Sequence, residues 1–149
     1  MDETETYIKM CGKATEIQAL MTRDMKRDPR NYAYCPTHGT MVNVIFGEYE
    51  CVECPVKWVK GDSIDAWIVL PQQDQLITML DEMAHWEIRY YPPVKRINEN
   101  EPFEIDVFSD RYSVITASTI EQGLLAAVMS ERYQKTWDGE NWISSTGSL

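Results

Sequence analysis

Four residues with metal-binding side chains lie in two short pairs. Cys35 and His38 are separated by two residues, as are Cys51 and Cys54, and twelve residues lie between His38 and Cys51. Two turns that each offer two ligands from one side suit tetrahedral Zn²⁺ coordination. Because protein ligands fill all four positions, no position remains for a reacting water. The spacing therefore predicts a structural zinc site and not a catalytic one.

The chain between the two pairs supports a zinc ribbon. It reads as a β-hairpin with a turn at Gly47, and Gly39 stands where a metal-binding turn needs a positive φ. The alternative for Cys51 and Cys54 is a redox pair or two free thiols. A redox Cys-x-x-Cys opens a helix, whereas the segment that follows here has the pattern of an extended chain. We therefore expect a zinc ribbon over residues 32–70.

Composition and cysteine use indicate a folded protein in a reducing compartment. Of the 149 residues, 44% are hydrophobic and 26% are charged, which is typical of globular domains. Cys11 is left over from the ribbon, so no even disulfide framework exists. The acidic start of the chain is unlike a signal peptide, and no apolar run approaches the ~20 residues of a membrane span. We expect a cytoplasmic protein that does not bind membranes.

The charge is strongly acidic, and most of it lies in the second half of the chain. The net charge is −10, and residues 72–149 hold 6 Lys and Arg against 13 Asp and Glu. Nucleic-acid binding draws most of its affinity from a basic surface. The charge therefore argues against direct nucleic-acid binding, unless a local basic patch outweighs it.

An amphipathic helix is predicted over about residues 3–27, within an N-terminal segment of residues 1–31. Tyr7, Met10 and Ile17 belong to an apolar stripe that repeats every three or four residues. A cluster of basic residues lies at the end of this helix and just after it. This cluster and two lysines of the ribbon are the candidate nucleic-acid contacts: Arg23, Lys26, Arg27, Arg30, Lys57 and Lys60.

The sequence of residues 71–149 predicts an α-β-β-β-α sandwich with a three-stranded antiparallel sheet. The whole chain is therefore expected to belong to the α+β class. Pro71 suits the first position of a helix, and Ser118 with Glu121 forms a capping box for the last helix, which ends near Tyr133. The three strands are expected at residues 86–91, 103–108 and 112–117.

The second of these strands has one core face and one acidic face. Phe103, Ile105 and Val107 alternate with Glu104 and Asp106. If the apolar set is buried, the two carboxylates point outward. Glu104 and Asp106 are therefore the candidate partner-binding residues.

Catalytic motifs are scarce. His85 is the only histidine outside the ribbon, and a lone histidine at the boundary of an element is more often a packed residue than a general base. The sequence has no nucleophile elbow and no phosphate-binding glycine loop. We expect a protein that is not an enzyme, with zinc as its only cofactor.

Two stretches resemble small uncharacterised proteins of bacteriophages and prophages. They are residues 70–76, Leu-Pro-Gln-Gln-Asp-Gln-Leu, and the pattern Y-x-K-x-W-x-G-x-x-W from Tyr133 to Trp142. In those proteins a zinc-knuckle segment precedes the first motif. The resemblance covers about residues 32–142 and implies a phage or mobile-element setting without a specific activity.

Two functions from different classes follow. The first is a phage-type, non-catalytic protein-binding module. Its acidic surface would engage a basic groove on a host nucleic-acid enzyme, as anti-CRISPR and anti-restriction inhibitors do. The alternative is a zinc-ribbon accessory factor that contacts nucleic acid directly through its basic residues. The charge of the chain favours the first.

Overall fold

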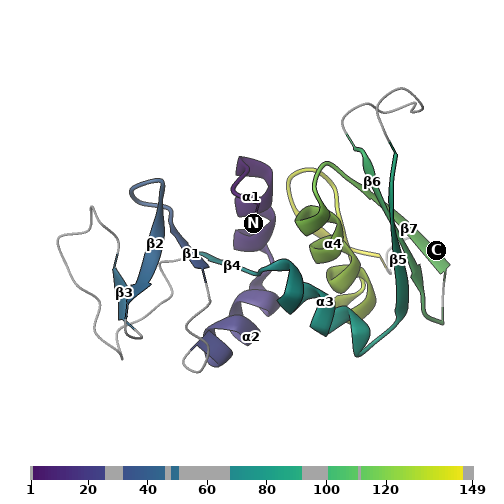
Figure 1. The fold of residues 1–149 in the computed structure, drawn as a ribbon, viewed down its shortest axis with the longest axis horizontal. Coiled ribbons are helices and arrows are strands. Elements are labelled where there is room, and N and C mark those ends of the chain that lie inside the picture. The colour runs from purple at the N-terminus through teal and green to yellow at the C-terminus, as the bar shows by residue number, and fades with distance from the viewer. Residues whose placement is uncertain are drawn as a thin grey trace. The chain divides into compact units, whose positions relative to one another are not determined.

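A computed structural model describes residues 2–25, 32–45, 48–50, 68–91, 101–110 and 112–145 (Figure 1). The described chain is mixed α+β, with four helices and small antiparallel sheets, so the predicted α+β class is confirmed. It divides into two compact units: unit 1 comprises Met1–Met10 and Gln73–Leu149, and unit 2 comprises Cys11–Gln72. Among the described helices, none combines the length and the apolar character that crossing a membrane requires.

The N-terminal segment forms two helices, α1 (Glu5–Lys13) and α2 (Thr15–Met25), so the prediction of one uninterrupted helix is wrong. The break is at Ala14, whose amide donates to the carbonyl of Cys11 at 3.1 Å. This hydrogen bond spans three residues, as in a 3₁₀-helix, whereas those of an α-helix span four. The apolar stripe continues across this break with buried side chains on both sides. For this reason the periodicity alone did not reveal it.

Unit 2 contains a four-stranded antiparallel sheet in the order β3-β2-β1-β4. The strands are β1 (Tyr32–Cys35), β2 (Thr40–Ile45), β3 (Glu48–Glu50) and β4 (Ile68–Leu70). Helix α2 packs on β4, which lies at one edge of the sheet.

The side chain of Gln18 in α2 completes the hydrogen bonding of this edge. Its Oε1 accepts from the amide of Val69 at 2.8 Å, and its Nε2 donates to the carbonyl of Val69 at 2.9 Å. The side-chain amide therefore satisfies both backbone groups of Val69, as a neighbouring strand would. This edge of β4 is consequently covered at its centre.

Unit 1 contains a three-stranded antiparallel sheet in the order β5-β6-β7, with α4 against β6 and β7 (Figure 1). Helix α3 contacts α4 and β5. Along the chain these elements are α3 (Gln73–Asp81), β5 (His85–Tyr90), β6 (Phe103–Phe108), β7 (Tyr112–Ala117) and α4 (Ile120–Tyr133).

Helix α4 approaches the sheet closely because residue 123 is a glycine. A Cβ atom at Gly123 would lie 2.7 Å from Cδ1 of Ile105 and 3.2 Å from Cβ of Ala117. Ile105 and Val107 are fully buried, as the strand alternation predicts. The face of the sheet that carries Ile105 is therefore the core face.

The N-cap of α4 is Thr119 and not Ser118, so the predicted capping box is wrong. The Thr119 Oγ1 accepts from the amide of Gln122 at 3.2 Å. Glu121 is buried and accepts from Nε2 of Gln73 at 2.9 Å. The carboxylate of Glu121, which the predicted capping box requires, therefore binds the first residue of α3 instead.

The N-terminal residues of unit 1 are tied to the start of α4. Asp2 is 6% exposed and accepts three hydrogen bonds, from the amide of Thr4 at 2.8 Å, Oγ1 of Thr119 at 2.5 Å and Nε2 of Gln122 at 3.0 Å. The same Gln122 nitrogen donates to Oγ1 of Thr4 at 3.0 Å. This network joins residues that are more than 100 positions apart.

A short hairpin, β8 (Lys135–Trp137) and β9 (Trp142–Ser144), follows α4 and was not predicted. Asp138 stabilises its turn by accepting from the amides of Glu140 and Asn141 at 2.8 and 2.7 Å. The indole nitrogen of Trp142 donates to the carbonyl of Met10 at 2.9 Å. The hairpin thus contacts the N-terminal segment of unit 1 at Met10.

Candidate functional site

The first predicted ligand pair lies at the turn between β1 and β2. Cys35 pairs with Thr40 across the hairpin, and the amide of Gly39 donates to the carbonyl of Cys35 at 2.9 Å. Gly39 has a φ of 66°, which a residue with a side chain adopts at a cost. The turn brings Sγ of Cys35 and Nδ1 of His38 to 3.5 Å from each other.

This separation can be compared with the edge of a tetrahedral zinc site. Bond lengths of about 2.3 Å to sulfur and 2.0 to 2.1 Å to nitrogen, at a tetrahedral angle, place the two ligand atoms about 3.6 Å apart. The two side chains therefore fit a shared Zn²⁺. Cys51 and Cys54 lie outside the described residues, and among the described ones no three His, Cys, Asp or Glu side chains gather as a metal-binding group.

The outer face of the β5-β6-β7 sheet is the side opposite the buried Ile105, and it carries both candidate partner-binding residues. Alternation and register place nine residues on it: His85, Glu87, Arg89, Glu104, Asp106, Phe108, Tyr112, Val114 and Thr116. Ionic side chains occupy the middle of this face, and aromatic rings lie in one row across it.

Asp106 lies on the outer face but has no exposed area, so the expectation of a surface carboxylate is wrong at this position. Its Oδ1 accepts from the hydroxyl of Tyr112 at 2.5 Å, and its Oδ2 lies 3.1 Å from Nε of Arg89. The bond from Tyr112 is the main reason that the pKa of this tyrosine is raised, because losing the proton would remove it. Two long side chains from the flanking strands therefore cover the carboxylate.

Glu104 remains partly accessible. Its carboxylate lies 3.7 Å from Nη1 of Arg89 and accepts from the hydroxyl of Tyr91 at 3.1 Å, and its side chain is 22% exposed. Glu87 also lies 3.7 Å from this guanidinium and is more accessible, at 53%. Glu87, which is not among the predicted partner-binding residues, is thus more exposed than Glu104.

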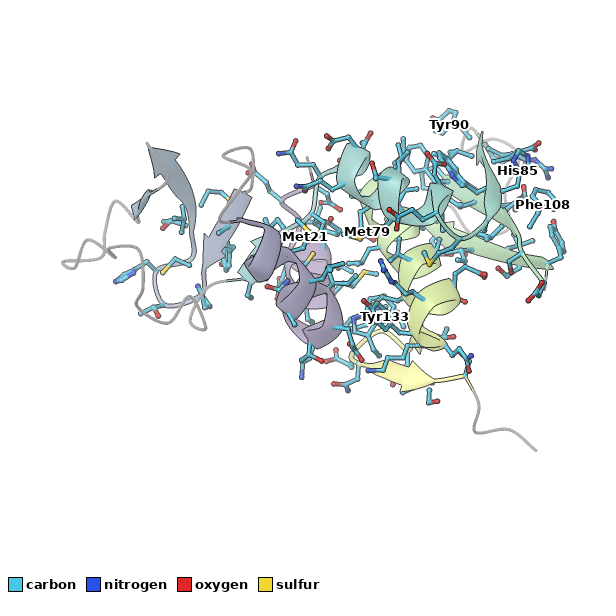
Figure 2. All side chains as sticks on the ribbon, turned by 90° about the horizontal axis from the view of Figure 1, so that it is seen from below. Met21, Met79, His85, Tyr90, Phe108 and Tyr133 are labelled. Atoms are coloured by element: carbon cyan, nitrogen blue, oxygen red, sulfur yellow. The ribbon has the colours of Figure 1, made fainter. Side chains whose placement is uncertain are left out.

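An aromatic row, which was not predicted, crosses one end of the outer face. The ring of Phe108 lies 5.8 Å from that of His85 and 5.3 Å from that of Tyr112, measured between centroids. Figure 2 shows His85 and Phe108 side by side at this end. Phe108, Tyr112 and neighbouring Val114 are 39%, 61% and 45% exposed. The strand alternation places Phe108 on the same face as Glu104, and this is the sequence signal from which the row could have been predicted.

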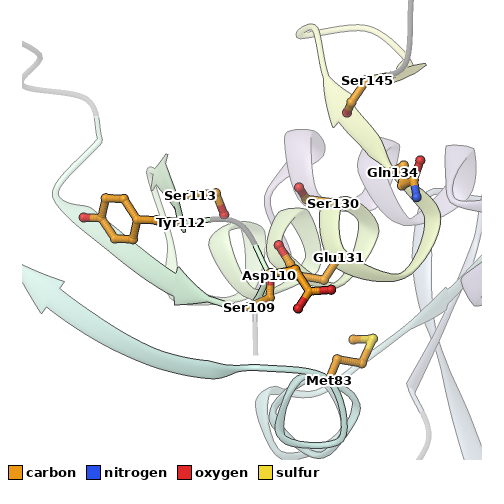
Figure 3. A pocket seen from close by; sticks show the side chains of 9 residues that line it. All are labelled: Met83, Ser109, Asp110, Tyr112, Ser113, Ser130, Glu131, Gln134 and Ser145. Carbon is orange, nitrogen blue, oxygen red and sulfur yellow. The ribbon is translucent and has the colours of Figure 1, made fainter.

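A cavity of about 550 Å³ lies in unit 1 beside the C-terminal end of α4 (Figure 3). Its described lining is mainly polar: Met83, Ser109, Asp110, Tyr112, Ser113, Ser130, Glu131, Gln134 and Ser145. No local sequence pattern predicts this cavity, because its walls come from segments that are distant along the chain.

The predicted nucleic-acid contacts fall almost entirely outside the described residues. Arg23 belongs to helix α2, and its backbone alone is described. The other candidates lie in stretches that the structure does not describe: Lys26, Arg27, Arg30, Lys57 and Lys60. Direct binding of nucleic acid through this group stays a prediction.

Compared with protein-family models, curated proteins and solved structures, the chain shows no match. The resemblance to phage proteins accordingly stays a prediction.

Proposed function

We propose that this protein is a non-catalytic protein-binding module that contacts its partner through the outer face of the β5-β6-β7 sheet. One observation carries the proposal: a row of exposed rings lies beside accessible carboxylates on one sheet face. Exposed aromatic side chains grouped in this way are typical of protein interfaces.

The partner of this face is a protein with a basic surface. Glu87 and Glu104 supply negative charge, and the rings of Phe108 and Tyr112 supply faces on which a lysine or arginine side chain can stack. The acidic net charge of the chain steers such a partner towards it over longer distances. Within a phage setting, a host nucleic-acid enzyme with a basic groove is the partner of this kind, which would make the protein an anti-CRISPR or anti-restriction type of inhibitor.

We further propose that unit 2 is held by a structural zinc ion on Cys35, His38, Cys51 and Cys54. The distance between Sγ of Cys35 and Nδ1 of His38 supports the first of these two ligand pairs, and the second pair rests on the sequence spacing. One equivalent of zinc should co-purify with the protein and be lost from a Cys35→Ser variant. Elemental analysis that finds no metal in the folded protein would refute this part of the proposal.

The binding face can be tested with a matched pair of substitutions in a pull-down from nuclease-treated bacterial lysate. Val114 on the outer face and Ile143 on β9 are 45% and 49% exposed, so Val114→Lys and Ile143→Lys place the same charge at equally exposed apolar positions. We expect capture of a basic protein by the wild type and by Ile143→Lys, with a loss of at least tenfold for Val114→Lys.

Two results would contradict the proposed binding face. One is capture that Val114→Lys and Ile143→Lys reduce equally. The other is capture that disappears on nuclease treatment and follows neutralisation of the basic residues, which would favour the nucleic-acid accessory factor.

A further inference from the structure

We propose that two copies of this chain associate by pairing their β7 strands edge to edge, which joins two three-stranded sheets into one continuous sheet. Strand β7 lies at one edge of its sheet, with β6 on one side and no described strand on the other. Pairing at this edge leaves the outer face of the sheet uncovered. The dimer is therefore additional to the proposed contact with a basic partner.

The free side of the β7 backbone offers hydrogen-bonding groups to a further strand. In an antiparallel sheet, alternate residues of an edge strand point their N–H and C=O groups away from the neighbouring strand. In the part of the chain that the structure describes, no residue outside β6 forms a hydrogen bond with the backbone of β7. An extended segment is the element whose backbone matches such a row of donors and acceptors.

The other sheet edges in the described structure are protected, whereas that of β7 is not. Natural edge strands are guarded by charged residues, by a covering group or by being short. Two of the three residues of β3 are glutamates, Gln18 covers the centre of β4, β5 exposes Glu87 and Arg89, and β8 and β9 have three residues each. Strand β7 reads Tyr-Ser-Val-Ile-Thr-Ala, without a charge, a proline or a glycine.

The side chains of β7 are complementary to those of a second β7. Paired strands place residues of the same face opposite each other, so an antiparallel β7 pair has two long registers, which match residues 112–116 or 113–117 of the two copies. In both registers Val114 lies directly or diagonally opposite its counterpart. Val114 is 45% exposed, and pairing places an identical apolar side chain beside it.

Charge also directs two copies to this edge and limits the assembly to a dimer. Each chain has a net charge of −10, so copies repel each other wherever their carboxylates meet. No charged side chain belongs to β7, so pairing here brings no like charges into direct opposition. The other edge of the same sheet carries Glu87 and Arg89, which hinder the addition of further strands. The pair therefore closes with two-fold symmetry.

Sedimentation equilibrium of the full chain over a concentration series tests the pairing. We expect a monomer–dimer equilibrium that tightens as salt screens the repulsion between the acidic chains. With rising concentration, hydrogen exchange should slow at alternate amides of β7, those that do not bond to β6, while the amides of β5 keep their rates. Chains that stay monomeric at every concentration and salt level overturn the proposal.

Opposite charges at Val114 give the sharpest comparison. Val114→Lys and Val114→Glu should each weaken the dimer at least tenfold, because like charges then face each other, whereas an equimolar mixture of the two variants should restore a heterodimer. Ile143→Lys and Ile143→Glu, at a similarly exposed apolar position on β9, are the matched controls and should leave the dimer unchanged. A mixture that associates no more tightly than either variant alone, or a dimer that the Ile143 variants weaken as strongly, overturns the proposal.

A further variant separates edge pairing from an association through the outer face. Glu87 lies on β5, at the opposite edge of the sheet from β7. Glu87→Gln should therefore leave the dimer unchanged, even where it weakens capture of a basic partner. A dimer that Glu87→Gln disrupts would place the contact between copies on the outer face and overturn the pairing of β7 strands.

Discussion

Asp106 has no exposed area, and its two carboxylate oxygens face Tyr112 and Arg89. Breaking such a pair from one side leaves an uncompensated buried charge, which is strongly destabilising. A charge reversal at Asp106 would therefore report on folding and not on partner binding. Glu87, at the accessible side of the same arginine, is the residue at which the charge of this face can be changed safely.

Asp2 is the second buried carboxylate with a defined role. Burial alone would raise its pKa, but hydrogen bonds from Thr119, Thr4 and Gln122 together outweigh this and lower it below the ordinary value of 3.8. A carboxylate whose pKa is lower in the folded state stabilises the fold above the unfolded pKa. This contribution is lost as the pH falls through the folded value.

Replacing Asp2 by asparagine should therefore destabilise the protein in a pH-dependent way. At pH 7 we expect the free energy of unfolding to fall by about 1 to 2 kcal/mol, through weakened charge-assisted hydrogen bonds. The difference from the wild type should begin to shrink below pH 3.8, where Asp2 of the unfolded chain takes up its proton, and should be lost as the pH falls through the lower folded pKa. Urea denaturation at pH 7 and pH 3 measures this, with Glu3→Gln as an exposed control. A difference independent of pH would show that the charge of Asp2 is not involved.

The cap of α4 gives a prediction that separates two adjacent residues. Thr119→Ala should cost about 1 to 2 kcal/mol, because it removes both the bond from the amide of Gln122 and the bond to Asp2. Ser118→Ala should change the free energy of unfolding by less than about 0.5 kcal/mol, since Ser118 is exposed and does not cap the helix. Thermal denaturation of the two variants side by side is the measurement, and a larger effect at Ser118 would reverse the assignment.

At the scale of the elements, the edge of β4 depends on one glutamine from α2. Gln18→Ala should expose the amide and the carbonyl of Val69 and lower the stability of unit 2 by about 2 kcal/mol. Hydrogen exchange of the Val69 amide should quicken accordingly. Lys13→Ala, an exposed change at the end of α1, is the control. An unchanged exchange rate of the Val69 amide would mean that water replaces the Gln18 side chain without loss of stability.

The elements that the sequence predicts best are those with local signals. The strands β5, β6 and β7 are found within one residue of their expected bounds, because aromatic and β-branched residues alternate there with polar ones. The hairpin of β8 and β9 was missed because three residues per strand are too few to show alternation. The cap of α4 was misplaced because Ser118 and Thr119 are both suitable caps, and the contacts that accompany the Thr119 cap are with residues distant along the chain, from Thr119 to Asp2 and from Gln73 to Glu121.

The candidate site could be predicted only where its residues are close in sequence. Cys35 and His38 share one turn, and the structure brings their ligand atoms together. The burial of Asp106 depends on side chains from two other strands, and no local pattern reports how a long arginine or tyrosine will lie. The same holds for the cavity, because its lining joins segments from Met83 to Ser145.

At the scale of the whole molecule, the two units should respond differently to metal removal. Structural zinc contributes on the order of 10 kcal/mol of apparent folding free energy in small modules. A strong zinc chelator should therefore abolish hydrogen-exchange protection in β1 and β2, while amides of β5, β6 and β7 stay protected. Cys35→Ser should reproduce the effect without the chelator. Protection of β1 that survives both treatments would show that unit 2 folds without a metal.

The hydrogen bond between Trp142 and Met10 joins residues that are 132 positions apart, and it has a consequence for synthesis on the ribosome. Chains emerge N-terminus first at about 5 to 20 residues per second, so residue 142 follows residue 10 after roughly 7 to 26 seconds. Unit 2 can fold during that interval, whereas the first helical turns of the chain must wait for the last hairpin. The buried Tyr7 and Met10 are thus exposed in the nascent protein. We expect them to be a segment that chaperones hold until the β8-β9 hairpin has emerged from the ribosome.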